Sequence, residues 1–423
     1  MKILPISHPL NSAVRVPGSK SLTNRALLIA SLANGKTHIT NALFSDDSRY
    51  FAKALQTLGF DVQLDESDHE MAVTGLGGEI PAVKAELFIG NAGTAARFLS
   101  AFLTLGHGEY ILDGEPRMRE RPIGDLIDSL SQLGAKISPL HPSMICPPVK
   151  ITASGLPGGK AQIAGNISSQ FLSALLMVAP YAKSPIEIEL TTELNSKPYV
   201  NMTLAIMRDF GVGVERSDYS YFTIHPNLYS PISNYLIESD ASAASYFFAA
   251  PAICGGTVKV ENISRQSVQG DIGFLGVLQQ MGCTVFESDN CLLITGPTEL
   301  RGVDVDMRDI SDTAQTLAAI APFASSPTRI CGIASARVKE TDRISATCNE
   351  LKRLGVQVEE HEDGMTIYPC QTFKPASIQT YNDHRMAMAF SLIGLRFNGV
   401  TIDNPSCVTK TFPNFFEVLD SLR

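Results

Sequence analysis

The sequence predicts an α/β protein built from six repeated units, packed as two groups of three. A turn followed by alternating strand residues recurs six times, beginning at residues 35, 108, 184, 256, 326 and 399, which lie 70 to 76 residues apart. A second pattern, an apolar residue and a glycine before a strand, recurs in the same phase at LGFDV, LGAKI, FGVGV, MGCTV and LGVQV. Solenoid repeats usually span about 20–50 residues, so this period favours globular subdomains over a linear array.

Each unit is expected to contain helix, strand, helix and strand, with further strands in the remainder. In the first unit, apolar residues at helical spacing predict a helix over residues 19–33, which stops before Asn34-Gly35. A second helix is expected over residues 46–58, again ending at a glycine. The sixth unit is incomplete, because the chain ends at FFEVLDSLR where the second pattern would fall.

Composition excludes several classes of protein. The 423 residues include 43 acidic and 34 basic side chains, a formal net charge of −9. This balance argues against a nucleic-acid or anionic-membrane partner, because both select for positive surfaces. Hydrophobic residues make up 44% of the chain, enough to form large cores, but the longest apolar stretches are shorter than the roughly 20 residues that cross a bilayer. We therefore expect no nucleic-acid and no membrane partner.

Cysteine and histidine patterns give no sign of a metal site or a disulfide framework. The eight cysteines form no CxxC pair, and the eight histidines show no HExxH spacing. The first ten residues, MKILPISHPL, lack the apolar run of a signal peptide. The segment NGKT resembles the end of a P-loop, but Ala30 stands where that motif requires glycine. These patterns indicate a reduced, cytoplasmic protein.

Unusual polar residues gather at six predicted helix N-termini, one in each unit. The segments are PGSKSLTNRALL, GNAGTAARFLSAF, GNISSQFLSALL, ESDASAASYFFAA, RDISDTAQTLAAI and YNDHRMAMAFSL. Small and acidic residues there are typical helix caps, which explains part of the pattern without any function. Their first turns also hold Lys20, Arg25, Arg97, Gln170, Asp312, His384 and Arg385. Cations at this end oppose the helix dipole, so the sequence predicts that phosphate or carboxylate ligands bind between them.

Two further runs of basic residues can be interpreted either as solvated surface or as part of an anion-binding site. RMRERP contains Arg117, Arg119 and Arg121, and RVKETDR contains Arg337, Lys339 and Arg343 around Glu340. A charge run is usually a solvated face, and that interpretation fits either run taken alone. Grouped with the helix-start cations and Lys410, they instead predict one anion-binding cleft in a protein that is acidic overall.

Taken together, these motifs resemble the 5-enolpyruvylshikimate-3-phosphate synthases, the enolpyruvyl transferases of aromatic amino-acid biosynthesis. The matching segments are PGSKSLTNRAL, LFIGNAGTAARFL, DGEPRMRERPIGDL, NISSQFLSALLM, SKPYVNMTL, ESDASAASYF, DISDTAQTLAA, RVKETDR, YNDHRMAMAF and KTFPNFFE. They occur in the family's order and cover residues 17–417. Each segment is weakly specific, but ten in order are highly specific.

The resemblance implies a two-lobed, inside-out α/β barrel of six βαβαββ-type repeats, three in each lobe. One lobe is expected to span residues 20–235, and the other to combine residues 1–19 with 236–423. The active site is expected in the cleft between the lobes. The resemblance also implies a monomer.

It implies a reaction as well: the enolpyruvyl group of phosphoenolpyruvate moves to the 5-hydroxyl of shikimate 3-phosphate, and phosphate is released from a tetrahedral ketal. No metal or organic cofactor is expected. By motif, the contacts to shikimate 3-phosphate are Lys20, Ser21, Arg25, Ser168, Ser169, Gln170, Ser196, Tyr199, Asp312, Ser335 and Lys339. Those to phosphoenolpyruvate are Lys20, Asn91, Gly93, Thr94, Arg121, Gln170, Arg343, His384, Arg385 and Lys410. Guanidinium groups suit this task because they bind carboxylate and phosphate in a bidentate way.

Acid–base roles follow from the same resemblance. Asp312 is implied to be the base for the 5-hydroxyl, while Glu340, with Lys20, handles the methylene proton. Two positions depart from the family's pattern: Ser335 stands where asparagine is common, and Phe98 where proline is common. Because Gly93 is retained, we expect glyphosate, the family's inhibitor, to compete with phosphoenolpyruvate.

Two other functions compete with this one. The sister enzyme that transfers enolpyruvyl to UDP-N-acetylglucosamine shares the six-unit architecture, but it uses a loop cysteine, and RMRERP contains none. A non-catalytic anion-binding protein on the same repeats would be expected to lack the acid–base pair, whereas Asp312 and Glu340 are both present.

Overall fold

The computed structural model describes residues 1–141 and 145–423, which form two compact units. The continuous unit runs from Gly18 to Ile237, and the split unit combines Met1–Pro17 with Glu238–Arg423. The sequence analysis placed the two crossings near Ser19 and Tyr235. Each unit has its own core of buried apolar side chains.

The continuous unit contains three four-stranded sheets in the part of the chain that is described, with the orders β13-β2-β4-β3, β5-β6-β8-β7 and β11-β12-β10-β9. One pair in each sheet is parallel, namely β13 with β2, β5 with β6 and β9 with β10. The other pairs are antiparallel. The strands are β2 (Asn34–Thr40), β3 (Asp61–Asp65), β4 (Glu70–Leu76), β5 (Lys84–Phe88), β6 (His107–Asp113), β7 (Lys136–Pro139), β8 (Val149–Ser154), β9 (Gly159–Ile163), β10 (Ile186–Leu190), β11 (Glu215–Ser217), β12 (Tyr221–Ile224) and β13 (Tyr235–Leu236).

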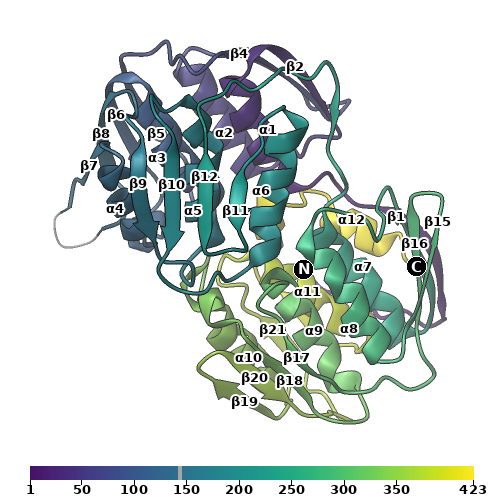
Figure 1. Cartoon of the computed structure of the whole chain (residues 1–423). Coiled ribbons are helices and arrows are strands. Elements are labelled where there is room, and N and C mark those ends of the chain that lie inside the picture. Colours follow the sequence, from purple (N-terminus) through teal and green to yellow (C-terminus); the bar gives the residue numbers. More distant parts are fainter. Residues whose placement is uncertain (142–144) are drawn as a thin grey trace. The chain divides into compact units, whose positions relative to one another are not determined.

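The split unit repeats this pairing in β1-β14-β16-β15 and β17-β18-β20-β19. Its third sheet is the parallel pair β21-β22, after which the chain continues into its last helix. Because β1 pairs with β14, the purple first strand lies beside green strands of the split unit in Figure 1. The strands are β1 (Leu10–Arg15), β14 (Gly256–Glu261), β15 (Thr284–Ser288), β16 (Cys291–Thr295), β17 (Asp304–Asp306), β18 (Thr328–Cys331), β19 (Val358–His361), β20 (Gly364–Ile367), β21 (Ala376–Ile378) and β22 (Val400–Ile402).

The recurring pairing confirms the predicted α/β class and its repeat. The six predicted turn-and-strand segments form β2, β6, β10, β14, β18 and β22, and each of these strands has a parallel neighbour. The second pattern marks the end of a helix and the strand that follows it, as at Leu58 before β3. The first two helices were predicted to within a residue or two of their observed ends.

Two kinds of helix alternate along the chain. The central helices begin at or just after the six predicted N-termini: α1 (Lys20–Leu32), α3 (Gly93–Phe102), α5 (Ser169–Val178), α7 (Ala241–Cys254), α9 (Ala314–Ile320) and α11 (His384–Arg396). Nearly all their residues are buried, which is why their sequences are largely apolar beyond the first turns. The others have an exposed side and are α2 (Asp46–Thr57), α4 (Gly124–Gln132), α6 (Lys197–Asp209), α8 (Phe274–Gln280), α10 (Arg343–Arg353) and α12 (Phe415–Asp420).

Side-chain caps fix the starts of four central helices. Ser19 accepts a hydrogen bond from the Leu22 amide, and Ser168 accepts one from the amide of Gln170. In the split unit, Asp240 caps α7 and Asp383 caps α11. These caps confirm that helix capping explains part of the polar pattern at the helix N-termini. Capping does not explain the nearby cations.

Gly75 allows β4 to lie against the end of α1. A Cβ atom at this position would lie 2.1 Å from the Ala30 carbonyl oxygen and 2.2 Å from that of Ala33. Gly296, which follows β16 in the split unit, meets the Pro251 carbonyl oxygen in the same way, at 1.8 Å. Because these neighbours are backbone atoms, they cannot rotate away.

Gly75→Ala is therefore expected to lower the free energy of unfolding by about 2 kcal/mol or more, the cost of forcing a methyl group against packed backbone. Urea denaturation followed by circular dichroism measures it. Gly213→Ala is the matched control, since a Cβ there would meet no atom within 4 Å. Equal stability of the two variants would contradict this account of the β4 packing.

Candidate active site

In the continuous unit, polar contacts join the start of α1 to α2 and the start of α5 to that of α3. Lys20 begins α1, and its Nζ lies 3.6 Å from a carboxylate oxygen of the buried Asp47 on α2. The Gln170 side chain, from the first turn of α5, donates a hydrogen bond to Thr94 Oγ1 on α3 at 3.4 Å. Residues that the sequence assigned to both ligands are thereby grouped in one unit.

Arg121 and Gly93 form a tightly fitted pair beside α3. Arg121 Nη1 donates to the backbone oxygen and to Oδ1 of Asn91, both at 3.1 Å. A Cβ atom at Gly93 would lie 2.3 Å from Arg121 Nη2, so this guanidinium keeps its position only because residue 93 has no side chain. The sequence analysis assigned all three residues to phosphoenolpyruvate, and the structure brings all three into contact.

Two of the remaining assigned residues of this unit, Ser21 and Tyr199, contact Arg25. Its Nη1 donates to the Ser21 carbonyl at 2.9 Å and its Nη2 to the Tyr199 carbonyl at 3.2 Å. Ser196 precedes α6 with a left-handed φ of 58°, a conformation that turns the chain into the helix carrying Tyr199. Ser169 follows the cap residue Ser168 at the start of α5.

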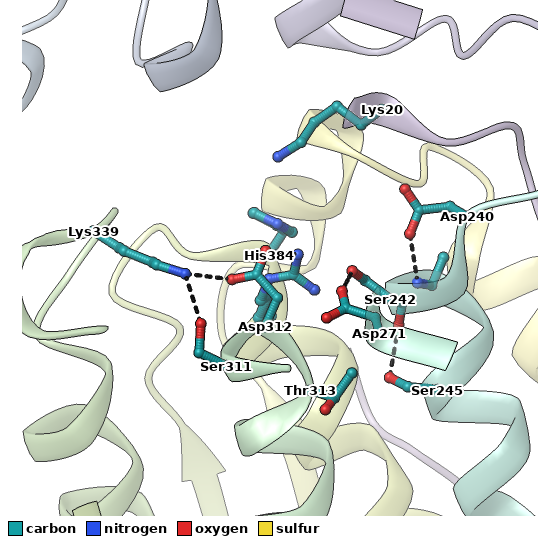
Figure 2. A network of polar contacts seen from close by, with 12 residues as sticks. Lys20, Asp240, Ser242, Ser245, Asp271, Ser311, Asp312, Thr313, Lys339 and His384 are labelled. Carbon is teal, nitrogen blue, oxygen red and sulfur yellow. Dashed lines mark hydrogen bonds and ion pairs between the residues drawn. The ribbon is translucent and has the colours of Figure 1, made fainter. Parts of the chain in front are cut away.

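A second cluster forms in the split unit around Asp312, which lies on the short helix η5 (Ser311–Thr313) directly before α9. Asp312 Oδ1 accepts from Lys339 Nζ at 2.6 Å and from Arg343 Nη1 at 3.1 Å. Its Oδ2 accepts from Arg385 Nη2 at 2.7 Å. Figure 2 shows the Lys339 ammonium directed at both Asp312 and Ser311. One carboxylate thus holds three cations from two separate segments, RVKETDR and YNDHRMAMAF.

Arg343 links Asp312 to two further carboxylates. Its Nη2 donates to Glu340 Oε2 at 2.8 Å, and its Nε donates to Asp383 Oδ2 at 2.7 Å. Glu340 also accepts from Lys410 Nζ at 2.8 Å, at the end of η8 (Pro405–Lys410). The two residues predicted to move protons, Asp312 and Glu340, therefore share one arginine.

These ion pairs control the ionisation of the cluster. Burial alone would raise the pKa of Asp312, but the charges of Arg385, Lys339 and Arg343 lower that pKa well below its usual range. Burial would lower the pKa of Arg343, and the charges of Asp383, Glu340 and Asp312 raise it instead. In this state Asp312 is fully ionised at neutral pH.

Asp271 is a nearby carboxyl group that the sequence analysis did not assign. It lies on η4 (Gly270–Gly273), is 3% exposed, and accepts a hydrogen bond from Ser242 in the first turn of α7 (Figure 2). Burial, followed by repulsion from Asp312, raises the pKa of Asp271 to about 6. Two carboxyl groups in one network thus have pKa values shifted in opposite directions.

Two assigned residues of the split unit make weaker connections to the cluster. Ser335 is partly exposed on η7 (Ala334–Val338), the segment that leads to Lys339. His384 is buried, and its Nδ1 lies 3.7 Å from an Asp383 oxygen.

Three arginines grouped with the cleft by sequence make surface ion pairs instead, and the first, Arg117, binds Glu120 at 2.9 Å. Arg119 binds Asp113, with an exposed arginine side chain. Arg337 binds Asp342 and Glu360. The ordinary interpretation of a charge run fits these three positions, since a carboxylate within reach on the same surface satisfies each guanidinium.

Sequence reasoning missed several supporting carboxylates besides Asp271. Asp383 lies within the YNDHR motif, and its position one residue before a helix could have identified it as the cap. Asp47 and Glu350 carry no comparable signal. Glu350 is fully buried on α10 and accepts from the Gln379 amide and the Tyr381 hydroxyl, both at 3.0 Å, so it holds the turn that precedes Asp383.

Two further features are absent from residues 1–141 and 145–423, the part of the chain that the structure describes. There, His, Cys, Asp and Glu form no group of three or more that could hold a metal ion. No helix in those ranges is both long and apolar enough to cross a membrane.

Comparison with known structures defines the class of the fold. The chain is similar to EPSP synthase from Acinetobacter baumannii, with a TM-score of 0.83 and 26% identity, covering 99% of this chain and 97% of that one. The enolpyruvyl transferase NikO from Streptomyces tendae matches at a TM-score of 0.78 over 100% of this chain and 96% of that one, and at 18% identity it supports the fold alone. Repeated α/β units with cation-bearing helix starts therefore place this chain in the enolpyruvyl transferase fold.

Sequence comparison then identifies the family. A model of EPSP synthase (3-phosphoshikimate 1-carboxyvinyltransferase) matches residues 4–419. Proteins named 3-phosphoshikimate 1-carboxyvinyltransferase match at 50% identity in Trichormus variabilis and 51% in Sulfurovum sp.. The alignments cover 97% and 98% of this chain, and 96% and 97% of those relatives. This chain belongs to the EPSP synthase family, which confirms the predicted transferase class.

The raised pKa of Asp271 predicts a pH-dependent stability. Since the folded protein holds this proton up to about pH 6 and the unfolded chain releases it near pH 4, wild-type stability falls as pH rises between these values. The Asp271→Asn variant has no carboxyl group to titrate at this position, so it lacks this dependence of stability on pH. Its amide oxygen still accepts a hydrogen bond from Ser242. The stability of this variant relative to wild type should increase between pH 4 and pH 7 by up to about 3 kcal/mol.

Urea denaturation at a series of pH values measures this difference. Asp68→Asn, on the exposed turn after β3, is the control for removing a carboxylate. A pH-independent difference between Asp271→Asn and wild type would show that the pKa of Asp271 is not raised in the folded protein.

Proposed function

We propose that this protein transfers the enolpyruvyl group of phosphoenolpyruvate to the 5-hydroxyl of shikimate 3-phosphate and releases phosphate. The single observation that carries the proposal is the Asp312 cluster, in which a candidate base lies within hydrogen-bonding distance of three cations. Both substrates carry a phosphate and a carboxylate, the anions that such cations bind. The names of the near full-length relatives support the same reaction.

The two units contribute different residues to this reaction in the proposal. The continuous unit supplies Lys20, Ser21, Arg25, Ser168, Ser169, Gln170, Ser196 and Tyr199 for shikimate 3-phosphate, and Lys20, Asn91, Gly93, Thr94, Arg121 and Gln170 for phosphoenolpyruvate. The split unit supplies Asp312, Ser335 and Lys339 for the first substrate, and Arg343, His384, Arg385 and Lys410 for the second. These assignments rest on motif resemblance and on the clustering described above.

Proton transfers follow from the chemistry of addition and elimination. Asp312 takes the proton of the 5-hydroxyl as its oxygen bonds to the central carbon of phosphoenolpyruvate. Glu340, with Lys20, delivers a proton to the methylene carbon, which gives the tetrahedral ketal. In the second step that methyl group loses a proton, the double bond re-forms, and the carbon–oxygen bond to phosphate breaks. The surrounding cations stabilise charge on the carboxylate and on the departing phosphate.

The depressed pKa of Asp312 makes it a weak base before substrates bind. Substrate phosphate and carboxylate groups would compete for Lys339, Arg343 and Arg385, and each competing anion reduces the positive charge felt by Asp312. Its pKa then rises toward the operating pH, where a general base is most effective. Binding of the anionic substrates therefore activates the base.

A coupled phosphate-release assay with each acceptor tests the proposed function. We expect turnover with shikimate 3-phosphate and none with UDP-N-acetylglucosamine, the acceptor of the sister enzyme. Turnover with the nucleotide sugar alone would overturn the proposal. No phosphate release with either acceptor, from folded protein, would favour the non-catalytic alternative.

Asp312→Asn should reduce kcat by about a hundredfold or more, because the amide cannot accept the hydroxyl proton. Calorimetry should still detect binding of shikimate 3-phosphate. Asp304→Asn, which removes an exposed carboxylate from β17, should leave kcat unchanged. Undiminished turnover of the Asp312→Asn variant would remove Asp312 from the mechanism.

Glyphosate should inhibit competitively with phosphoenolpyruvate, since Gly93 and Arg121 retain the close fit expected around that substrate. A titration at several phosphoenolpyruvate concentrations measures it. Inhibition that does not weaken as phosphoenolpyruvate increases would contradict the assignment of these two residues.

A monomeric state and a cytoplasmic location also stay predictions. Light scattering coupled to size-exclusion chromatography tests the monomeric state.

A further inference from the structure

Arg25 is a buried cation held only by neutral groups in the described part of the chain. It is 2% exposed on α1. Its Nε donates to Thr203 Oγ1 at 2.8 Å, and its terminal nitrogens donate to the Ser21 and Tyr199 carbonyls and to Ser173 Oγ. Burial lowers the pKa of Arg25 to about 10, so the group stays charged at neutral pH. Burying a charge without a counter-ion is costly, and this one needs another source of negative potential.

The Phe98 ring supplies such a source. The guanidinium carbon of Arg25 lies over this ring, 5.2 Å from its centre. Phe98 is fully buried on α3, the helix that also begins with Gly93 and Thr94. The face of an aromatic ring carries negative electrostatic potential and attracts a cation within about 6 Å. The ring occupies the face of the planar group, while the hydrogen bonds above hold its edges.

We propose that Phe98 is a positioning residue for shikimate 3-phosphate, acting through Arg25. The ring offsets part of the burial cost of the charge and fixes the orientation of the guanidinium, without using any of its N–H donors. A group held in its binding geometry loses less entropy when the ligand arrives. The inference rests on the proposed function, because Arg25 is there a contact to shikimate 3-phosphate.

The inference assigns a specific role to a departure from the family's pattern. By the resemblance noted above, proline is the residue expected at this position, and a proline ring offers no aromatic face. We therefore expect Phe98 to affect the binding of shikimate 3-phosphate, through Arg25 on α1, more than the binding of phosphoenolpyruvate. This is expected even though Gly93 and Thr94, on the same helix as Phe98, are assigned to phosphoenolpyruvate.

Replacement of Phe98 by 3,4,5-trifluorophenylalanine tests this directly, because fluorine weakens the negative potential of the ring face with little change in shape. Phe102 is the matched control: it is fully buried on the same helix and packs on Phe60, with 5.8 Å between ring centres. Calorimetry gives the Kd of shikimate 3-phosphate for each protein, and steady-state assays give both KM values.

Fluorination at Phe98 should weaken shikimate 3-phosphate binding by about two- to tenfold, with a smaller change in the KM for phosphoenolpyruvate. The same change at Phe102 should alter neither the Kd of shikimate 3-phosphate nor the KM for phosphoenolpyruvate. Phe98→Leu and Phe102→Leu, compared in the same way, remove the rings altogether and should reproduce the contrast. Unchanged affinity at Phe98, or equal losses at the two positions, would overturn the inference.

The unsubstituted protein separates this inference from the proposed function. If it turns over shikimate 3-phosphate and fluorination at Phe98 has no effect, only the role of Phe98 fails. If the unsubstituted protein does not bind shikimate 3-phosphate, both proposals fail.

Discussion

Buried positive charge is the constraint on which the rest of this structure depends. A cation removed from water must be met by anions, carbonyls or an aromatic face close by. The two units meet this requirement differently. In the split unit, Arg343 binds three carboxylates, whereas in the continuous unit Arg25 has carbonyls, hydroxyls and the Phe98 ring. The first arrangement offers charges that ligand anions can compete for, and the second offers a charge that has no carboxylate partner among residues 1–141 and 145–423.

The repeated fold explains how so many cations reach the same places. Each repeat sets a parallel strand pair beside a central helix, and the polar groups sit where these helices begin. Side-chain contacts at the helix starts, such as Gln170 to Thr94 and Arg385 to Asp312, join residues that lie 76 and 73 positions apart in sequence. One repeat length therefore separates partners that touch. The buried helices keep these starts rigid, which allows a site to be assembled from segments that are each weakly specific.

The sequence predicted the repeat, the six helix starts and most of the clustered residues, because periodic patterns and cations at helix N-termini are local signals. It could not separate Arg121 from Arg119, since one guanidinium is buried beside Gly93 and the other pairs with Asp113, a difference that only tertiary packing creates. The supporting carboxylates Asp271 and Glu350 were missed for the same reason. Each is an ordinary acidic residue until distant segments fold over it and bury it.

In the proposed mechanism, cations hold the pKa of Asp312 well below its usual range until substrate anions compete for those cations. A carbon-13 NMR titration of the Asp312 carboxyl, assigned by its loss in Asp312→Asn, tests this most directly. We predict that the carboxyl in the ligand-free protein stays ionised down to pH 4, and that it begins to protonate at higher pH with shikimate 3-phosphate and glyphosate bound. A midpoint at or above the usual value of about 3.9 in the ligand-free protein, or no upward shift on binding, would contradict the account.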